Sequence, residues 1–161
     1  TENTVWVVDV LAISRPLTKA EGTPVAPVAG LPTVTFDEKA GPTITVPSGA
    51  AAPTELVAQN LIDGTGAVVA AGQQVTVHYT GALWKDASVF DSSWTKGSPF
   101  AFQVGAGRVI PAWDKGFVGK KVGSRVLLVV PPAEGYGSAG SPPKISGTDT
   151  LVFVVDILAA N

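Results

Sequence analysis

The chain has 161 residues, 45% of them hydrophobic, which is enough for one folded domain with additional segments and for a sizeable buried core. Its formal net charge is −2 at pH 7 with acids and bases interspersed, so it lacks the clustered lysine and arginine of a nucleic-acid-binding surface. The absence of cysteine and the presence of a single histidine exclude disulfides, thiolate sites and multi-histidine metal sites, and no apolar run approaches the length of a membrane span.

The first segment, residues 1–12, is predicted to be a strand because it is rich in β-branched and aromatic residues. It nearly repeats the last predicted strand, residues 148–159: aligned without gaps, seven of twelve positions are identical. This internal similarity predicts that the chain begins with the closing strand of a preceding, similar domain. A chance resemblance between two valine-rich strands is the alternative.

Residues 13–54 are predicted to form a proline- and glycine-rich linker that contains a hairpin. Residues 13–31 combine prolines and glycines with small side chains, a composition typical of an extended linker. Two short alternating segments, 32–36 and 42–46, flank a polar turn and predict the hairpin.

The remainder, residues 55–161, is predicted to be one domain made mostly of strands. Apolar side chains alternate at 75–79, 100–104 and 151–157, which places one set of side chains on a buried face. Val126–Val130 is a continuous apolar run, typical of a strand that is covered on both faces.

One short helix is expected, at residues 111–118. Proline suits its first position because the N–H that proline lacks has no intrahelical partner there. Trp113 and Phe117 are four residues apart and so share one face, and Gly119 is expected to end the helix. One short helix among antiparallel strands predicts an α+β domain with a twisted antiparallel sheet wrapped around the helix.

Six segments in the second half of the chain carry aromatic, glycine and aspartate residues in a distinctive order. They are VTVHYTG at 75–81, FDSS at 90–93, FAFQVG at 100–105, VIPAWDKG at 109–116, PAEGYG at 132–137 and LVF at 151–153. Together, over residues 72–161, they resemble the FKBP family of immunophilins, which are peptidyl-prolyl cis-trans isomerases.

The resemblance implies a pocket with an indole at its floor and no metal or cofactor. The residues that it assigns to catalysis are Tyr79, Asp91, Trp113, Tyr136 and Phe153. The residues that it assigns to substrate binding are Phe90, Phe100, Val109, Ile110 and Ile145. In the family, the backbone N–H at the position of Ile110 and the hydroxyl at the position of Tyr136 bind substrate carbonyls.

The chain departs from the family pattern in two loops. The turn at Asp86-Ala87 lacks a frequent glycine, and the loop after Tyr136 contains Pro142-Pro143-Lys144-Ile145 in place of the usual run. These departures bear on sequence preference and on macrolide fit more than on the basic activity.

The residue types suit rotation about an X-Pro amide, whose barrier of about 18–20 kcal/mol comes from amide resonance. The twisted transition state is less dipolar than the planar amide, so an aromatic pocket that withdraws water destabilises the planar form. His78 follows Val77 and precedes Tyr79 on one strand, which turns it to the opposite face from Tyr79 and argues against a role as a base.

The leading interpretation is an isomerase acting on X-Pro-containing polypeptides. The alternative is a non-catalytic module that binds a proline-containing segment or a rapamycin-type macrolide within a multi-domain exported protein. A composition rich in alanine, glycine, valine, threonine and proline with few charges is common in exported proteins of GC-rich, actinobacterial-like bacteria. It predicts an exported or cell-envelope location and leaves a cytoplasmic one open.

Overall fold

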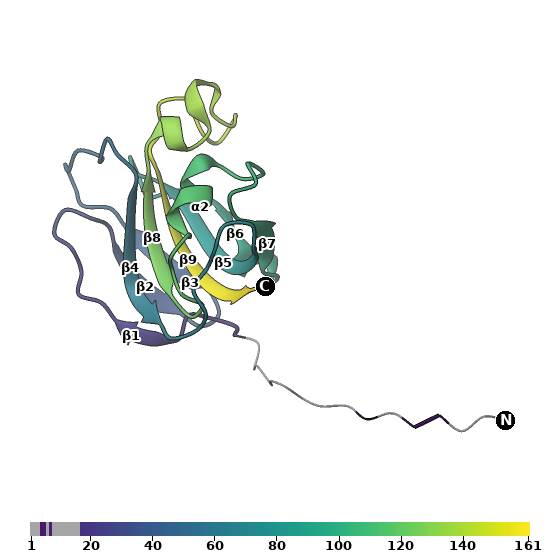
Figure 1. The fold of residues 1–161 in the computed structure, drawn as a ribbon. Helices are drawn as coiled ribbons and strands as arrows, with labels where there is room; N and C mark the ends of the chain where they lie inside the picture. The colour runs from purple at the N-terminus through teal and green to yellow at the C-terminus, as the bar shows by residue number, and fades with distance from the viewer. Residues whose placement is uncertain (1–3, 6, 8–16) are drawn as a thin grey trace.

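A strongly curved antiparallel sheet dominates the computed structural model, which describes residues 4, 5, 7 and 17–161 (Figure 1). The strands are β1 (Gly22–Pro24), β2 (Thr33–Asp37), β3 (Gly41–Thr45), β4 (Val57–Gly64), β5 (Gln74–Leu83), β6 (Val89–Ser92), β7 (Phe100–Gln103), β8 (Arg125–Val130) and β9 (Leu151–Ala160). The helices are α1 (Ser93–Lys96) and α2 (Pro111–Gly116), with 3-10 turns at Pro132–Glu134 and Gly137–Ala139. Within the described residues, this is the predicted α+β architecture.

The main sheet runs in the order β1-β4-β8-β9-β5-β6, and β7 also pairs with β5. β9 lies between β8 and β5, and its register with β5 runs from Val75 opposite Ala160 to Leu83 opposite Leu151. β9 is buried along its first eight residues. Because a central strand has neighbours along both edges and cover on both faces, an almost unbroken apolar sequence suits it.

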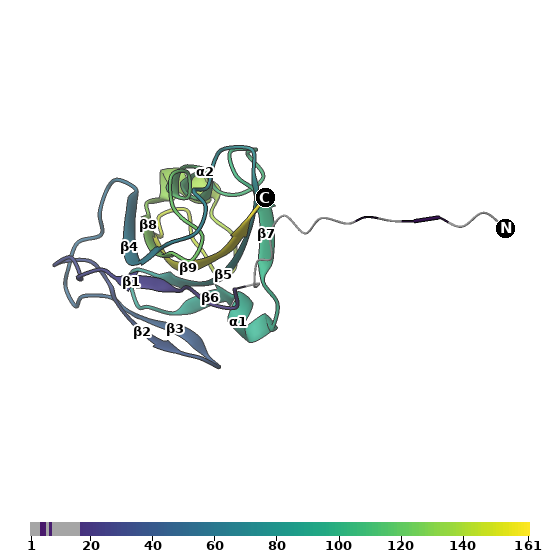
Figure 2. The same ribbon diagram turned by 60° about the horizontal axis from the view of Figure 1, so that its bottom comes forward.

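The sheet lies between α2 on one side and the β2–β3 hairpin on the other (Figure 2). Each face carries a hydrophobic core. On one face α2 packs its Trp113 and Phe117 against alternate residues of β5, β8 and β9. On the other face the β2–β3 hairpin and the segment after it cover the remaining residues of the same strands, around Ile44 and Trp84. The Trp84 indole donates a hydrogen bond to the Ala50 carbonyl at 3.2 Å, which fixes this cover to β5.

The predicted hairpin is confirmed, but the prediction that residues 13–54 form a linker is wrong for the part that the structure describes. β1 extends the main sheet by pairing with β4, and the β2–β3 hairpin packs on the sheet as a second layer. The physical reason is that β8 and β9 are apolar on both faces, so without this segment one face would leave a large apolar area in water.

The predicted strand at residues 1–12 lies outside the described residues, apart from Thr4, Val5 and Val7, which are exposed. The interpretation of this segment as the closing strand of a preceding domain therefore stays a prediction.

The predicted helix is confirmed as α2, which ends at Gly116, slightly earlier than expected. The four-residue α1, which was not expected, ends at Gly97 in a left-handed conformation with φ 71°. A single turn carries no periodic apolar pattern, which is why the sequence offered no signal for it. No helix in the described part of the chain is long and apolar enough to cross a bilayer.

The turn between β5 and β6 contains Ala87, the one non-glycine residue with positive φ (56°) among the described residues. A left-handed backbone conformation costs alanine roughly 1–2 kcal/mol, and glycine removes this strain from the folded state. Glycine also increases the conformational entropy of the unfolded chain, which offsets part of that gain in stability. We expect Ala87→Gly to raise the free energy of unfolding by up to about 1 kcal/mol, measured by urea denaturation. The same change at Ala101, an exposed strand residue of β7, should lower it; a loss of stability in Ala87→Gly would contradict the strained turn.

Candidate functional site

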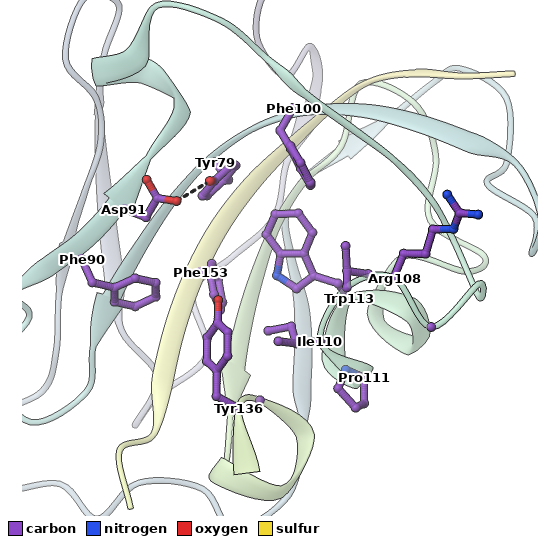
Figure 3. Close-up of a pocket in the computed structure, with 13 residues that line it drawn as sticks. Tyr79, Phe90, Asp91, Phe100, Arg108, Ile110, Pro111, Trp113, Tyr136 and Phe153 are labelled. Atoms are coloured by element: carbon purple, nitrogen blue, oxygen red, sulfur yellow. Dashed lines mark hydrogen bonds between the residues drawn. The ribbon is translucent and has the colours of Figure 1, made fainter. Parts of the chain in front are cut away.

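A cavity of about 480 Å³ opens beside the N-terminal end of α2 (Figure 3). Its lining comes from β5, β6, β7 and β9, the loop before α2, α2 itself and the turn after β8. The lining residues are Tyr79, Phe90, Asp91, Phe100, Gly107, Arg108, Val109, Ile110, Pro111, Trp113, Gly135, Tyr136 and Phe153. Nine of the ten residues predicted from the sequence are among them; Ile145 is not.

Trp113 forms the floor of the cavity and is 4% exposed. Its indole meets the rings of Tyr79 and Phe153 edge-on, at centroid distances of 5.2 Å and 5.4 Å. Phe117, one helical turn later, packs edge-on against the indole from below at 5.5 Å. Rings in these orientations attract each other through their quadrupoles, so the floor is held in place by its neighbours.

The rim of the cavity is positioned by Asp114, the residue after the tryptophan. Its carboxylate accepts hydrogen bonds from the Gly105 and Gly107 N–H groups at 2.7 Å and 2.9 Å. These bonds tie the loop that precedes α2 to the first turn of the helix. Val109 and Ile110, the last two residues of that loop, consequently lie at the cavity edge.

The walls depend on a glycine in β5. Phe153 of β9 lies opposite Gly81 in the sheet register. A Cβ atom at Gly81 would lie 2.6 Å from the Phe90 ring and 2.8 Å from the Phe153 ring, closer than side chains can approach. Gly81 therefore leaves the space in which these two rings meet edge-on, at 5.5 Å between centroids.

Asp91 is the carboxylate of the cavity, and it is held by three donors. The Tyr79 hydroxyl donates to Oδ2 at 2.6 Å, while Lys96 pairs with Oδ1 at 2.6 Å and the Ser92 N–H donates to Oδ1 at 2.9 Å. Burial raises the pKa of Asp91, but the hydrogen bonds from Lys96 and Tyr79 outweigh it and hold that pKa below its ordinary value of 3.8. Asp91 is thus ionised at neutral pH.

The two tyrosines of the cavity keep their protons. Burial and then the hydrogen bond to Asp91 raise the pKa of Tyr79 well above its ordinary value. Burial and then the Asp91 charge raise the pKa of Tyr136 as well. The Tyr136 hydroxyl can therefore donate a hydrogen bond to a ligand carbonyl, whereas the Tyr79 hydroxyl already donates its proton to Asp91.

Ile145, the tenth residue assigned to the site, does not line the cavity. Ile145 is 4% exposed and belongs to the same hydrophobic core as Trp113, so its role in substrate binding stays a prediction. Its N–H donates to the Ser141 carbonyl and its carbonyl accepts from the Ser141 N–H, so the loop closes on itself there. The loop is fastened to β6 by Lys144, whose ammonium donates to the Phe90 carbonyl at 2.9 Å.

Sequence reasoning missed two charged residues at the cavity. Lys96 lies on α1, and without that helix nothing predicted that it would reach Asp91. Arg108 stands directly before Val109, so its position next to the motif was an available signal.

The predicted orientation of His78 is confirmed. Its ring stacks on Trp94 at 4.3 Å between centroids, its Nδ1 lies 2.9 Å from the Ser93 hydroxyl, and it does not line the cavity. Among the described residues, no cluster of histidine, aspartate and glutamate is suited to hold a metal ion.

Comparison with known proteins gives consistent results. A family profile described as FKBP-type peptidyl-prolyl cis-trans isomerase matches residues 66–158. The chain is 43% identical over 112 residues to an FK506-binding protein of Streptomyces anulatus, covering 69% of this chain and 90% of that protein. It is 48% identical over 90 residues to peptidyl-prolyl cis-trans isomerase FKBP15-1 of Arabidopsis thaliana, covering 56% of this chain and 58% of that protein. The crystal structure of AtFKBP13 superposes with a TM-score of 0.62 at 30% identity, covering 68% of this chain and 96% of that one.

Proposed function

Because this chain belongs to the FKBP-type peptidyl-prolyl cis-trans isomerase family, we propose that it accelerates rotation about X-Pro peptide bonds in the cavity above Trp113. The observation that carries the proposal is the aromatic cavity itself. Its floor is an indole and its walls are the rings of Tyr79, Phe90 and Phe153. A compact, rigid and apolar proline ring suits such a site.

The cavity acts on the amide by removing water from it. The planar X-Pro amide is strongly dipolar and is stabilised by water, whereas the twisted transition state has lost resonance and much of that dipole. Exchanging water for aromatic rings therefore destabilises the planar form more than the twisted one. Each 1.36 kcal/mol of this difference accelerates rotation about tenfold, and no bond to the protein has to form.

The polar groups at the edge of the cavity orient the substrate. The Tyr136 hydroxyl and the Ile110 N–H are placed to donate to substrate carbonyls beside the proline, and the described residues provide no hydrogen-bond partner for that N–H. The ionised Asp91 adds a fixed negative charge. It repels the partly negative carbonyl oxygen of the planar amide, and this repulsion is relieved as twisting removes charge from the oxygen.

The direct test is cis-to-trans turnover of a short X-Pro peptide, measured with and without a rapamycin-type macrolide. We expect turnover that the macrolide inhibits, because both ligands would occupy the same cavity. A folded protein that binds the macrolide without turning over the peptide would support the binding-module alternative. A folded protein that neither turns over the peptide nor binds the macrolide would contradict the proposal.

An exported or cell-envelope location stays a prediction.

His78 is the one side chain of the protein that ordinarily titrates near neutrality, and it lies on the far face of β5 from the cavity. Burial lowers its pKa below the ordinary value of 6.5. We expect His78→Ala to keep kcat/KM for an X-Pro peptide within about twofold of wild type, with a flat profile from about pH 7 to about pH 9 in both proteins. A large loss of kcat/KM in a folded His78→Ala protein, or a wild-type profile that follows an imidazole, would show that the chemistry uses a proton acceptor.

A further inference from the structure

Basic side chains lie at and beside the cavity, although the chain as a whole has a formal net charge of −2. Arg108 lines the cavity, Lys96 reaches Asp91, and Lys144 reaches the Phe90 carbonyl. Of these three cations only Arg108 lines the cavity, and Asp91 is the one carboxylate in the lining.

Arg108 and Lys144 have no acidic partner within residues 17–161, and Lys144 already donates to the Phe90 carbonyl. Lys96 is engaged by the Asp91 carboxylate, and no ion pair within 4.0 Å includes Arg108. Asp114 of α2, the acid that binds this loop, already accepts hydrogen bonds from Gly105 and Gly107. Asp114 offsets part of the charge at Arg108 without binding its guanidinium. Arg108 is exposed, and Figure 3 shows its guanidinium pointing outward, away from the indole of Trp113.

A second hollow, of about 540 Å³, adjoins the cavity on this side and is also lined by Arg108. The two hollows share Phe100, Arg108 and Val109, so they meet along one ridge. The second hollow is more polar, and its lining includes Gln74 at the start of β5 and Gln103 at the end of β7. A polypeptide whose proline occupies the cavity and whose chain leaves over this ridge would pass directly beside Arg108.

We propose that Arg108 is a specificity-determining residue that favours substrates with a carboxylate side chain on a residue flanking the X-Pro pair. This inference rests on the proposed isomerase function. The planar guanidinium presents its N–H groups in a fork that matches a carboxylate, and Arg108 has donors free for one. Because the site is open to water, the preference is modest and is screened by salt.

The test compares peptides that are identical except for glutamate, glutamine or lysine at one flanking position, with one set for each side of the X-Pro pair. For one of the sets, the wild-type ratio of kcat/KM for the glutamate peptide to that for the glutamine peptide should be about three to five at low salt. The lysine peptide should fall below the glutamine peptide. The glutamate-to-glutamine ratio should approach one in Arg108→Gln, should fall below one in Arg108→Glu, and should shrink in wild type at high salt.

The matched control is Lys121→Glu, which changes the net charge as Arg108→Glu does but at an exposed residue that does not line the cavity. It should keep the wild-type ratio. The proposal is overturned if both sets give a ratio near one in wild type, or if Lys121→Glu lowers the ratio as much as Arg108→Glu. Fluorescence titration of the same peptides gives the ratio from Kd values, so absence of turnover would count against the isomerase function while the charge preference remains measurable.

Discussion

Trp113→Leu is expected to lower kcat/KM for an X-Pro peptide by about 10- to 100-fold, which corresponds to about 1.4–2.7 kcal/mol of lost transition-state stabilisation. The indole is the floor of the cavity, and the edges of the Tyr79 and Phe153 rings rest on it. Leucine retains the apolar character but not the flat surface, so the walls lose their support and water enters beneath the substrate. Turnover of the peptide at a temperature where the variant is folded is the measurement.

The change also removes buried volume, so its effect on activity has to be separated from its effect on stability. Trp113 is 4% exposed, and substituting a large buried side chain by a smaller one costs roughly 2–5 kcal/mol of unfolding free energy. Leu127→Ala is the matched control, because Leu127 is 1% exposed and belongs to the core on the opposite face of the sheet. It should lose comparable stability and keep near-normal turnover while folded. Equal activity losses in the two folded variants would mean that the indole has no special role.

Asp156→Ala is expected to produce the largest loss of stability, about 3–5 kcal/mol of unfolding free energy. Asp156 is 1% exposed and forms a two-pronged ion pair with Arg125, with Nε to Oδ1 at 2.6 Å and Nη2 to Oδ2 at 2.7 Å. Oδ2 also accepts the Ala20 N–H at 2.8 Å, and the Arg125 guanidinium lies 3.8 Å from the centre of the Phe36 ring. Removing the carboxylate would leave a buried guanidinium without its partner and an orphaned N–H.

Urea denaturation of three variants tests this expectation. Replacing both members, as in Arg125→Leu with Asp156→Leu, should cost less than Asp156→Ala alone, because no unpaired charge is then buried. Lys85→Ala, which breaks an ion pair whose lysine is 57% exposed, should cost at most about 1 kcal/mol. A cost for Asp156→Ala that is no larger than that for Lys85→Ala would show that the buried pair does not hold the N-terminal segment on the sheet.

The sequence predicted the parts of this protein that depend on local pattern. Alternating apolar residues identified β5 and β9, and the proline and the spaced aromatics identified α2. Because successive side chains on a strand point to opposite faces, the same alternation predicted that His78 and Tyr79 lie on opposite faces of β5. The six family segments contain the nine of the ten expected residues that line the cavity, and those residues come from strands, from α2 and from the loops beside it.

Other features arise only from contacts between segments far apart in the chain, which a local pattern does not encode. Residues 17–54 look like a linker when considered alone, yet they cover the second face of β8 and β9 because that face is too apolar to remain in water. Ile145 is core because its loop closes at Ser141, and Lys96 belongs to the site because α1 brings it to Asp91. Local periodicity determined the strands, the helix and most of the cavity lining, and tertiary packing decided which segment covers the sheet and which charges reach the cavity.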